Sequence, residues 1–155
     1  MSGQPVERRF REWGTEDVLA ITTAGLVGGI GFAIVLAALG LLDSVGVLVD
    51  APGLVVGLPL ALIAGVVGAF VYRALGTLYP FEEDVTDPIT GVTLGTCFGV
   101  AVWVIGVAVL VPLWLRLLGR TPPFPFLHWQ SLVALLVYGA IVGPASPLVE
   151  RYVRL

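Results

Sequence analysis

Four long runs of apolar residues, separated by short polar segments, dominate the pattern of the chain. They cover residues 18–42, 53–72, 91–115 and 130–148, and none of the four contains a charged side chain. A helix needs about 20 apolar residues to cross roughly 30 Å of hydrocarbon. The pattern therefore predicts an all-α protein, in which residues 1–155 form a single domain, a bundle of four transmembrane helices with short tails.

The composition agrees with this prediction. Of the 155 residues, 57% are hydrophobic and 12% are charged, whereas soluble domains carry about 25% charged residues. The net charge of −3 gives no reason to expect a nucleic-acid partner. The lone cysteine, Cys97, excludes a disulfide within the chain. We expect the lipid bilayer to be the main partner.

The positions of the arginines predict the orientation. Two of them, Arg116 and Arg120, follow the third run. The other six precede the first run or follow the second or fourth run, which places them on the opposite side of the predicted membrane: Arg8, Arg9, Arg11, Arg73, Arg151 and Arg154. Basic residues accumulate on the cytoplasmic side of membrane proteins. We therefore expect a multi-pass protein of the cell membrane with cytoplasmic N- and C-termini. The acidic, arginine-rich N-terminal tail is unlike a cleaved signal peptide, so the first helix is expected to be retained.

The segment between the third and fourth runs has the composition of a turn at the membrane surface. Tryptophan and tyrosine favour the headgroup level, and prolines keep the backbone out of a helix. Gly119 is expected to end the third helix, and Pro112 to kink it a turn or more before its outer end. The predicted interfacial turn consists of Trp114, Pro122, Pro123, Phe124, Phe126, His128 and Trp129.

His128 is the only histidine. A single histidine in such a turn is more often a solvated or hydrogen-bonded surface residue than a functional one. The alternative is a ligand or a proton-handling group. We expect its replacement to leave folding intact, and the loss of Trp129 or of the Pro122/Pro123 pair to loosen the turn.

Glycines at intervals of four residues mark candidate packing faces. Close backbone approach across such faces holds membrane helices together. Since the chain contains 20 glycines, the spacing could also reflect composition alone. Gly95 is expected to be sensitive to a larger side chain, and Gly53, taken as exposed, to be tolerant. The predicted packing glycines are Gly25, Gly29, Gly91, Gly95, Gly99, Gly139 and Gly143.

The apolar runs lack the groups that most membrane chemistry needs. Proton- or ion-coupled transport uses an ionisable residue inside the membrane, and no run contains one. No serine–histidine pair, paired aspartates or HExxH pattern points to a hydrolase. We therefore expect neither an enzyme nor a cofactor.

Residues 109–152 resemble the C-terminal half of a family of small four-helix membrane proteins from halophilic archaea, some of which carry the label histidine kinase. The resemblance implies a four-helix fold. Family members tend to carry a histidine where this chain has Leu135, and no segment is long enough for the ATP-binding domain that a kinase needs. The matching positions are Val111, Pro112, Trp114, Leu115, the Pro122 to Phe126 loop, Leu136 to Gly143, and Pro147.

Three functions remain open from the sequence. The first, which we favour, is a non-enzymatic structural or accessory subunit that packs through its glycine faces, as a homo-oligomer or within a larger membrane complex. The second is a small oligomeric carrier or channel, lined at the Asp43/Asp50 end or by threonine and tyrosine side chains. The third is a membrane heme or metal protein that uses His128 between subunits.

Overall fold

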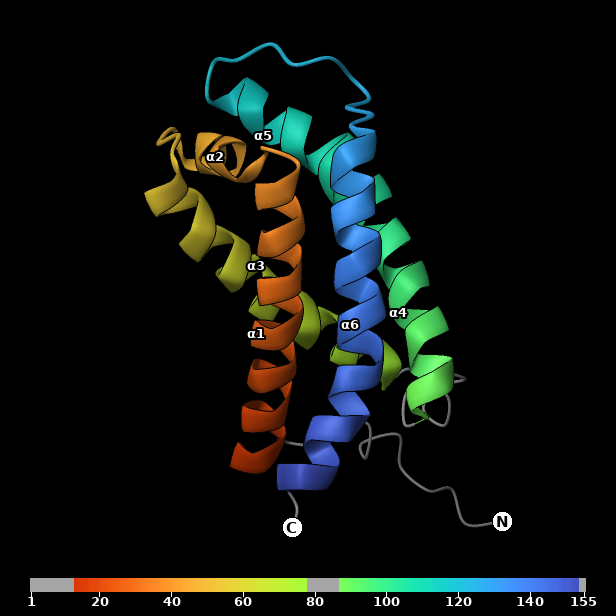
Figure 1. The fold of residues 1–155 in the computed structure, drawn as a ribbon. Coiled ribbons are helices and arrows are strands. Elements are labelled where there is room, and N and C mark those ends of the chain that lie inside the picture. Colours follow the sequence, from red (N-terminus) through yellow and green to blue (C-terminus); the bar gives the residue numbers. More distant parts are fainter. Residues whose placement is uncertain (1–12, 78–86, 154–155) are drawn as a thin grey trace, which may run out of the picture.

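A computed structural model describes residues 13–77 and 87–153, which form helices and no strand. Four helical segments are long and apolar enough to cross a membrane, so the predicted all-α class is confirmed (Figure 1). The third segment is continuous but changes its winding, and a short α-helix followed by a 3₁₀-helix joins the first two segments. The elements are α1 (Thr15–Ala38), α2 (Leu42–Val45), η2 (Gly46–Val49), α3 (Leu54–Gly76), α4 (Pro88–Val102), the π-helix η4 (Trp103–Leu110), α5 (Val111–Leu117) and α6 (Trp129–Val153).

The predicted end of the first helix, residue 42, is wrong. The helix stops at Ala38 because Gly40 adopts φ = 69°, which turns the chain out of the helix. The N–H of Leu41 then donates to the carbonyl of Leu36 at 2.8 Å, and Gly40 donates to Ala37 at 3.0 Å. This is the Schellman arrangement, which satisfies carbonyls that a helix end leaves free. Gly119, with φ = 78°, ends α5 in the same way, as predicted.

Most of the other predicted helices are too short, because their bounds followed the charge-free stretches. Helix α3 runs to Gly76, past Arg73, and α6 runs to Val153, past Glu150 and Arg151. An apolar run marks where the chain lies in hydrocarbon, whereas a helix continues into the polar surface. The helix α4 begins earlier than predicted because Asp87 caps it and Pro88 occupies its first position.

Pro112 causes the predicted irregularity in the third segment. Eight residues before α5, Trp103–Leu110, are wound as a π-helix, and the side chain of Pro112 is fully buried. Proline has no N–H to donate to the carbonyl four residues earlier, that of Ala108. This carbonyl instead accepts from the backbone N–H of Phe126 at 3.1 Å. The loop before α6 therefore satisfies the group that the proline leaves free.

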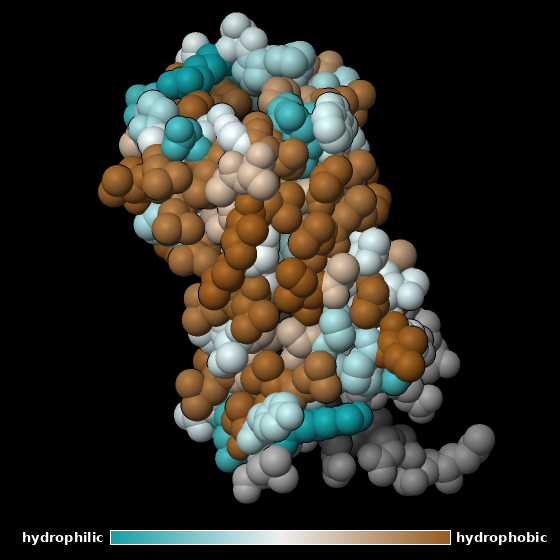
Figure 2. Space-filling model, in the orientation of Figure 1, coloured by the Kyte–Doolittle hydropathy of each residue, from teal (hydrophilic) through white to brown (hydrophobic). Residues whose placement is uncertain are grey.

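Helices α1 and α6 lie side by side at the centre, α3 packs on α1, and α4 packs on α6. One end of the molecule, the tail end, holds the start of α1, the end of α3, the start of α4 and the end of α6 (Figure 1). The opposite end, the turn end, holds residues 39–53 and 118–128. Figure 2 shows a broad apolar belt between two more polar ends, as a multi-pass membrane protein requires.

Candidate functional site

Three glycines of α4 face three residues of α6 in antiparallel register. Gly91 lies against Gly143, Gly95 against Gly139, and Gly99 against Leu135. A Cβ atom on Gly95 would overlap the carbonyl oxygen of Gly139 and would lie 2.9 Å from the Cα of Gly143. The two backbones are therefore in direct contact, in a geometry where weak Cα–H···O contacts form.

The predicted glycines of α1 pack against α3. A Cβ on Gly25 would lie 2.7 Å from the Cα of Val66, and a Cβ on Gly29 would lie 3.4 Å from the Cα of Gly65. Gly65 supplies the close approach on the α3 side of this interface, since its Cβ would lie 2.5 Å from Gly29 Cα and 2.9 Å from the Gly25 carbonyl oxygen. The predicted glycines thus form two separate interfaces, one in each half of the molecule.

Because these glycines are buried between helices of the same chain, the hypothesis that their faces bind a partner needs correction. A partner has to contact other surfaces. The predicted tolerance of Gly53 is wrong: a Cβ there would meet open space, but φ is 137°, a backbone conformation that strains any other residue.

Gly65 was not among the predicted packing residues, because the prediction used only pairs of glycines. The available signal was a stripe of small residues in α3, which are all buried and spaced by four: Gly57, Ala61, Gly65 and Ala69. Any small residue permits close approach of membrane helices, so alanine should have been counted with glycine.

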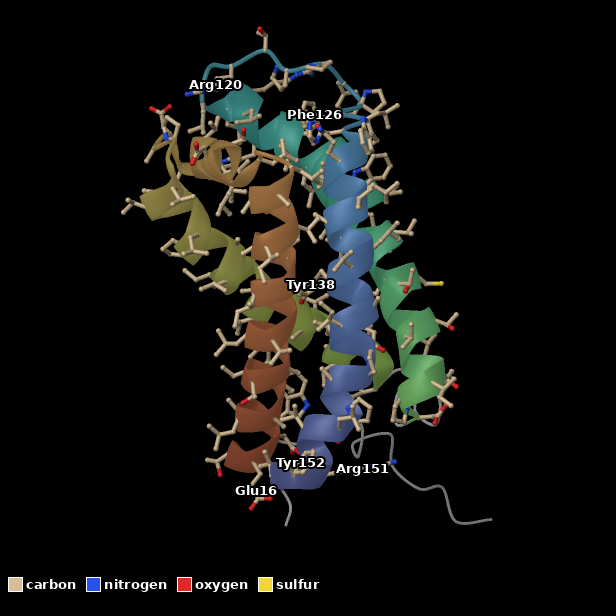
Figure 3. The ribbon with its side chains drawn as sticks, in the orientation of Figure 1. Glu16, Arg120, Phe126, Tyr138, Arg151 and Tyr152 are labelled. Carbon is tan, nitrogen blue, oxygen red and sulfur yellow. The ribbon has the colours of Figure 1, made fainter. Side chains whose placement is uncertain are left out.

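Tyr138 joins the two interfaces. Its ring extends from α6 across Gly28 of α1 to Gly68 of α3, and its hydroxyl donates to the carbonyl of Gly65 at 2.6 Å (Figure 3). Gly28 and Gly68 leave room for the Tyr138 ring, which a larger side chain at either position would occupy. Three hydroxyls on the helices bond to the carbonyl one turn back, as expected for such groups: those of Thr23, Thr96 and Ser146.

Two buried tyrosines provide a matched pair for measuring this bond. The hydroxyl of Tyr72 has no hydrogen-bond partner among the described residues, whereas that of Tyr138 does. We expect Tyr138→Phe to lower the free energy of unfolding by about 1 kcal/mol. Tyr72→Phe should leave it unchanged or raise it. Titration with a denaturing detergent measures both, and equal losses would contradict the assignment of the bond.

At the tail end, one ion pair ties α3 to α6. The guanidinium of Arg73 lies 2.8 Å from the carboxylate of Glu150, and these side chains are 19% and 14% exposed. Asp87 accepts hydrogen bonds from the N–H and the hydroxyl of Thr90, which hold the pKa of its carboxyl below the ordinary value. Asp87 therefore stays ionised and caps α4 at neutral pH.

At the turn end, two indoles and one ion pair fasten segments that are far apart in sequence. Trp103 donates to the carbonyl of His128 and to the hydroxyl of Ser131, each at 3.1 Å. Trp114 donates to the carbonyl of Leu48 at 2.7 Å. Arg120 pairs with Asp50 at 2.7 Å. The role of Trp103 was not predicted, because this residue lies inside an apolar run and no turn residue is next to it.

The structure brings the predicted turn residues to this end, in separate contacts. The guanidinium of Arg116 lies 5.5 Å from the ring centre of Phe124. The half-buried His128 ring stacks on Phe126 at 5.6 Å, whereas Trp129 is exposed and starts α6. Of the predicted prolines, Pro122 is half-buried and Pro123 exposed.

Within residues 13–77 and 87–153, no group of three histidine, cysteine or acidic side chains is placed to hold a metal ion. Comparison with protein families, curated proteins and solved structures finds no match. The resemblance to the halophilic family therefore stays a prediction that rests on the motifs of residues 109–152.

Proposed function

We propose that the chain is a non-enzymatic multi-pass protein of the cell membrane that acts as a structural or accessory subunit, with both termini in the cytoplasm. The observation that carries the proposal is that several polar groups between the helices bind one another, although the buried Tyr72 hydroxyl has no such partner among the described residues. Tyr138 bonds to Gly65, Trp103 to the His128 carbonyl, and Arg73 pairs with Glu150. Groups that are satisfied internally hold helices together and are not free for a solute.

The same contacts count against the carrier or channel alternative. Its proposed lining was either the Asp43/Asp50 end or a stripe of threonine and tyrosine side chains. Asp50 instead pairs with Arg120, and the Tyr138 hydroxyl bonds to backbone. The heme alternative requires His128 to face a second copy, and in this fold its ring stacks on Phe126.

The surface for a partner is predicted to lie on the helices that the rest of the chain covers least. Helices α3 and α4 flank the central pair, and their outward sides expose large apolar residues, among them Val55 and Ile63 of α3 and Ile89 and Val100 of α4. In a membrane these sides face lipid or another protein. The glycine faces are occupied within the chain, so we assign partner contact to these outward sides.

One purification tests the proposal against both alternatives. The full chain, extracted in mild detergent at high salt, should give either a homo-oligomer or a complex of fixed stoichiometry by native mass spectrometry. It should show no visible absorption, and vesicles containing it should leak ions no faster than empty ones. A leak that Asp50→Asn abolishes would establish the carrier. A heme absorption band that His128→Gln removes would establish the third function.

Cysteine labelling tests the orientation. In a Cys97→Ser background, a cysteine at Thr121 should react with an impermeant reagent added outside the cell, because the turn end is expected to face outward. A cysteine at Glu83, which lies outside the described residues, should react only after lysis. The opposite pattern would reverse the orientation and leave the fold unaffected.

A further inference from the structure

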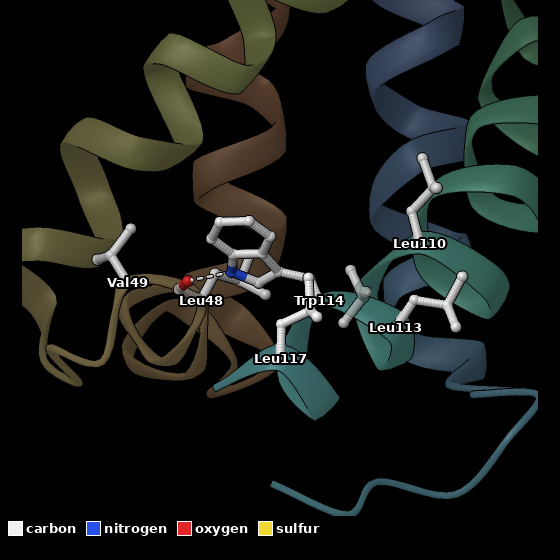
Figure 4. Close-up of a pocket in the computed structure, with 7 residues that line it drawn as sticks. Leu48, Val49, Leu110, Leu113, Trp114 and Leu117 are labelled. Atoms are coloured by element: carbon white, nitrogen blue, oxygen red, sulfur yellow. Dashed lines mark hydrogen bonds between the residues drawn. The ribbon is translucent and has the colours of Figure 1, made fainter. Parts of the chain in front are cut away.

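An apolar groove of about 550 Å³ opens on the surface at the turn end (Figure 4). One wall is Leu48 and Val49 of η2. The other is formed by the end of η4 and by α5, through Leu110, Leu113, Trp114 and Leu117. The groove is open along its side, and most of these side chains are exposed.

The bend of the third segment at α5 explains why a groove forms here (Figure 1). Beyond the π-helix, α5 leans toward η2, and Trp114 bridges the two elements by donating its indole N–H to the Leu48 carbonyl at 2.7 Å. This bond satisfies the only polar atom of the Trp114 side chain, so the indole ring presents an apolar wall. The groove therefore fits an apolar chain and offers almost nothing to a polar solute.

The helix α5, which forms one wall of the groove, also carries a cation. Arg116 lies on α5 one helical turn after the groove-lining Leu113 and directly before the groove-lining Leu117. Its side chain is exposed and lies over the Phe124 ring, and no acidic side chain of the described residues forms an ion pair with it. By contrast, Arg120 is already paired with Asp50.

We propose that this groove binds one acyl chain of an anionic phospholipid, whose phosphate pairs with Arg116. An apolar groove beside an unpaired guanidinium matches a ligand with an apolar chain and a negative head, and arginine binds phosphate in a well-defined geometry. The inference rests on the proposed membrane location, since the turn end would then lie at the headgroup level of one leaflet. A helix of a second copy would fill the groove but would bring no phosphate to Arg116.

Quenching of tryptophan fluorescence by brominated lipid tests this site. The chain is reconstituted into phosphatidylcholine vesicles that contain a small fraction of brominated phosphatidylglycerol or, in parallel, brominated phosphatidylcholine. The signal of Trp114 is taken as the difference between the wild type and Trp114→Phe. We expect an apparent affinity about fivefold higher for the anionic lipid, the preference that one arginine near a headgroup provides.

The variants separate the site from general charge effects. Arg116→Gln should remove the preference, and Arg116→Lys should retain most of it. Arg151→Gln, which removes an exposed arginine at the opposite end, is the matched control and should change nothing. Equal quenching by the two lipids, no effect of Arg116→Gln, or an equal effect of Arg151→Gln would overturn the proposal.

Two further outcomes have separate meanings. If neither lipid quenches Trp114 in a chain that floats with the vesicles, protein fills the groove and the lipid site is wrong. If the chain does not float with the vesicles, the proposed membrane location itself fails.

Discussion

Replacing Gly95 by leucine is expected to lower the free energy of unfolding by about 3 kcal/mol, the upper end of the range for overpacked interiors. The new side chain would meet backbone from two residues of α6, the carbonyl of Gly139 and the Cα of Gly143. Backbone cannot rotate aside as a side chain can, so α4 and α6 would have to separate along the whole row of glycine contacts between them. Unfolding in mixed detergent micelles measures the loss.

Gly106 provides the control, because it lies on the same helical segment. A Cβ there would meet only Cγ1 of Val102, at an ordinary 3.7 Å. Gly106→Leu should therefore change stability little, and Gly106→Ala should be neutral or stabilising, since alanine favours a helix. If Gly95→Leu and Gly106→Leu behave alike, the contact between α4 and α6 is not the cause. If Gly95→Leu does not lower the free energy of unfolding, α4 and α6 do not pack closely through these glycines.

The sequence predicted the helices well because crossing hydrocarbon imposes a strong requirement on length and charge. It also predicted the end at Gly119 and the irregularity at Pro112, since each follows from the chemistry of one residue. The end of α1 at Gly40 carried the same glycine signal, but the apolar residues Leu41 and Leu42 masked it. Helix ends and irregularities that depend on one glycine or proline were therefore predictable, except where apolar neighbours extended the hydrophobic run past them.

The pairing of helices was not predictable. A glycine stripe permits close approach but does not name the partner, so the sequence could not assign Gly95 to α6 or Gly25 to α3. The turn was predictable only in composition. Its anchors, Leu48 for Trp114 and Asp50 for Arg120, lie more than 60 residues away, and no local pattern connects them. One of these anchors is a backbone carbonyl, which every residue carries.

Gly65→Leu is expected to be as damaging as Gly95→Leu, with a loss of about 3 kcal/mol. The added side chain would meet the backbone of Gly25 and Gly29, which would force α3 away from α1. The matched control is Ala64→Leu, which places the same side chain one residue earlier, on the exposed side of α3. Unfolding in mixed micelles should show a large loss for the first variant and almost none for the second.

The Gly65 carbonyl also accepts the Tyr138 hydroxyl at 2.6 Å, which leads to a sharper result. If leucine at position 65 moves α3 off α1, the hydroxyl loses its acceptor in the same step. Tyr138→Phe should then cost about 1 kcal/mol in the wild type and close to nothing in the Gly65→Leu background. Strictly additive losses would mean that the tyrosine keeps its bond after the helices move, and that α3 is held by α6 independently of its contact with α1.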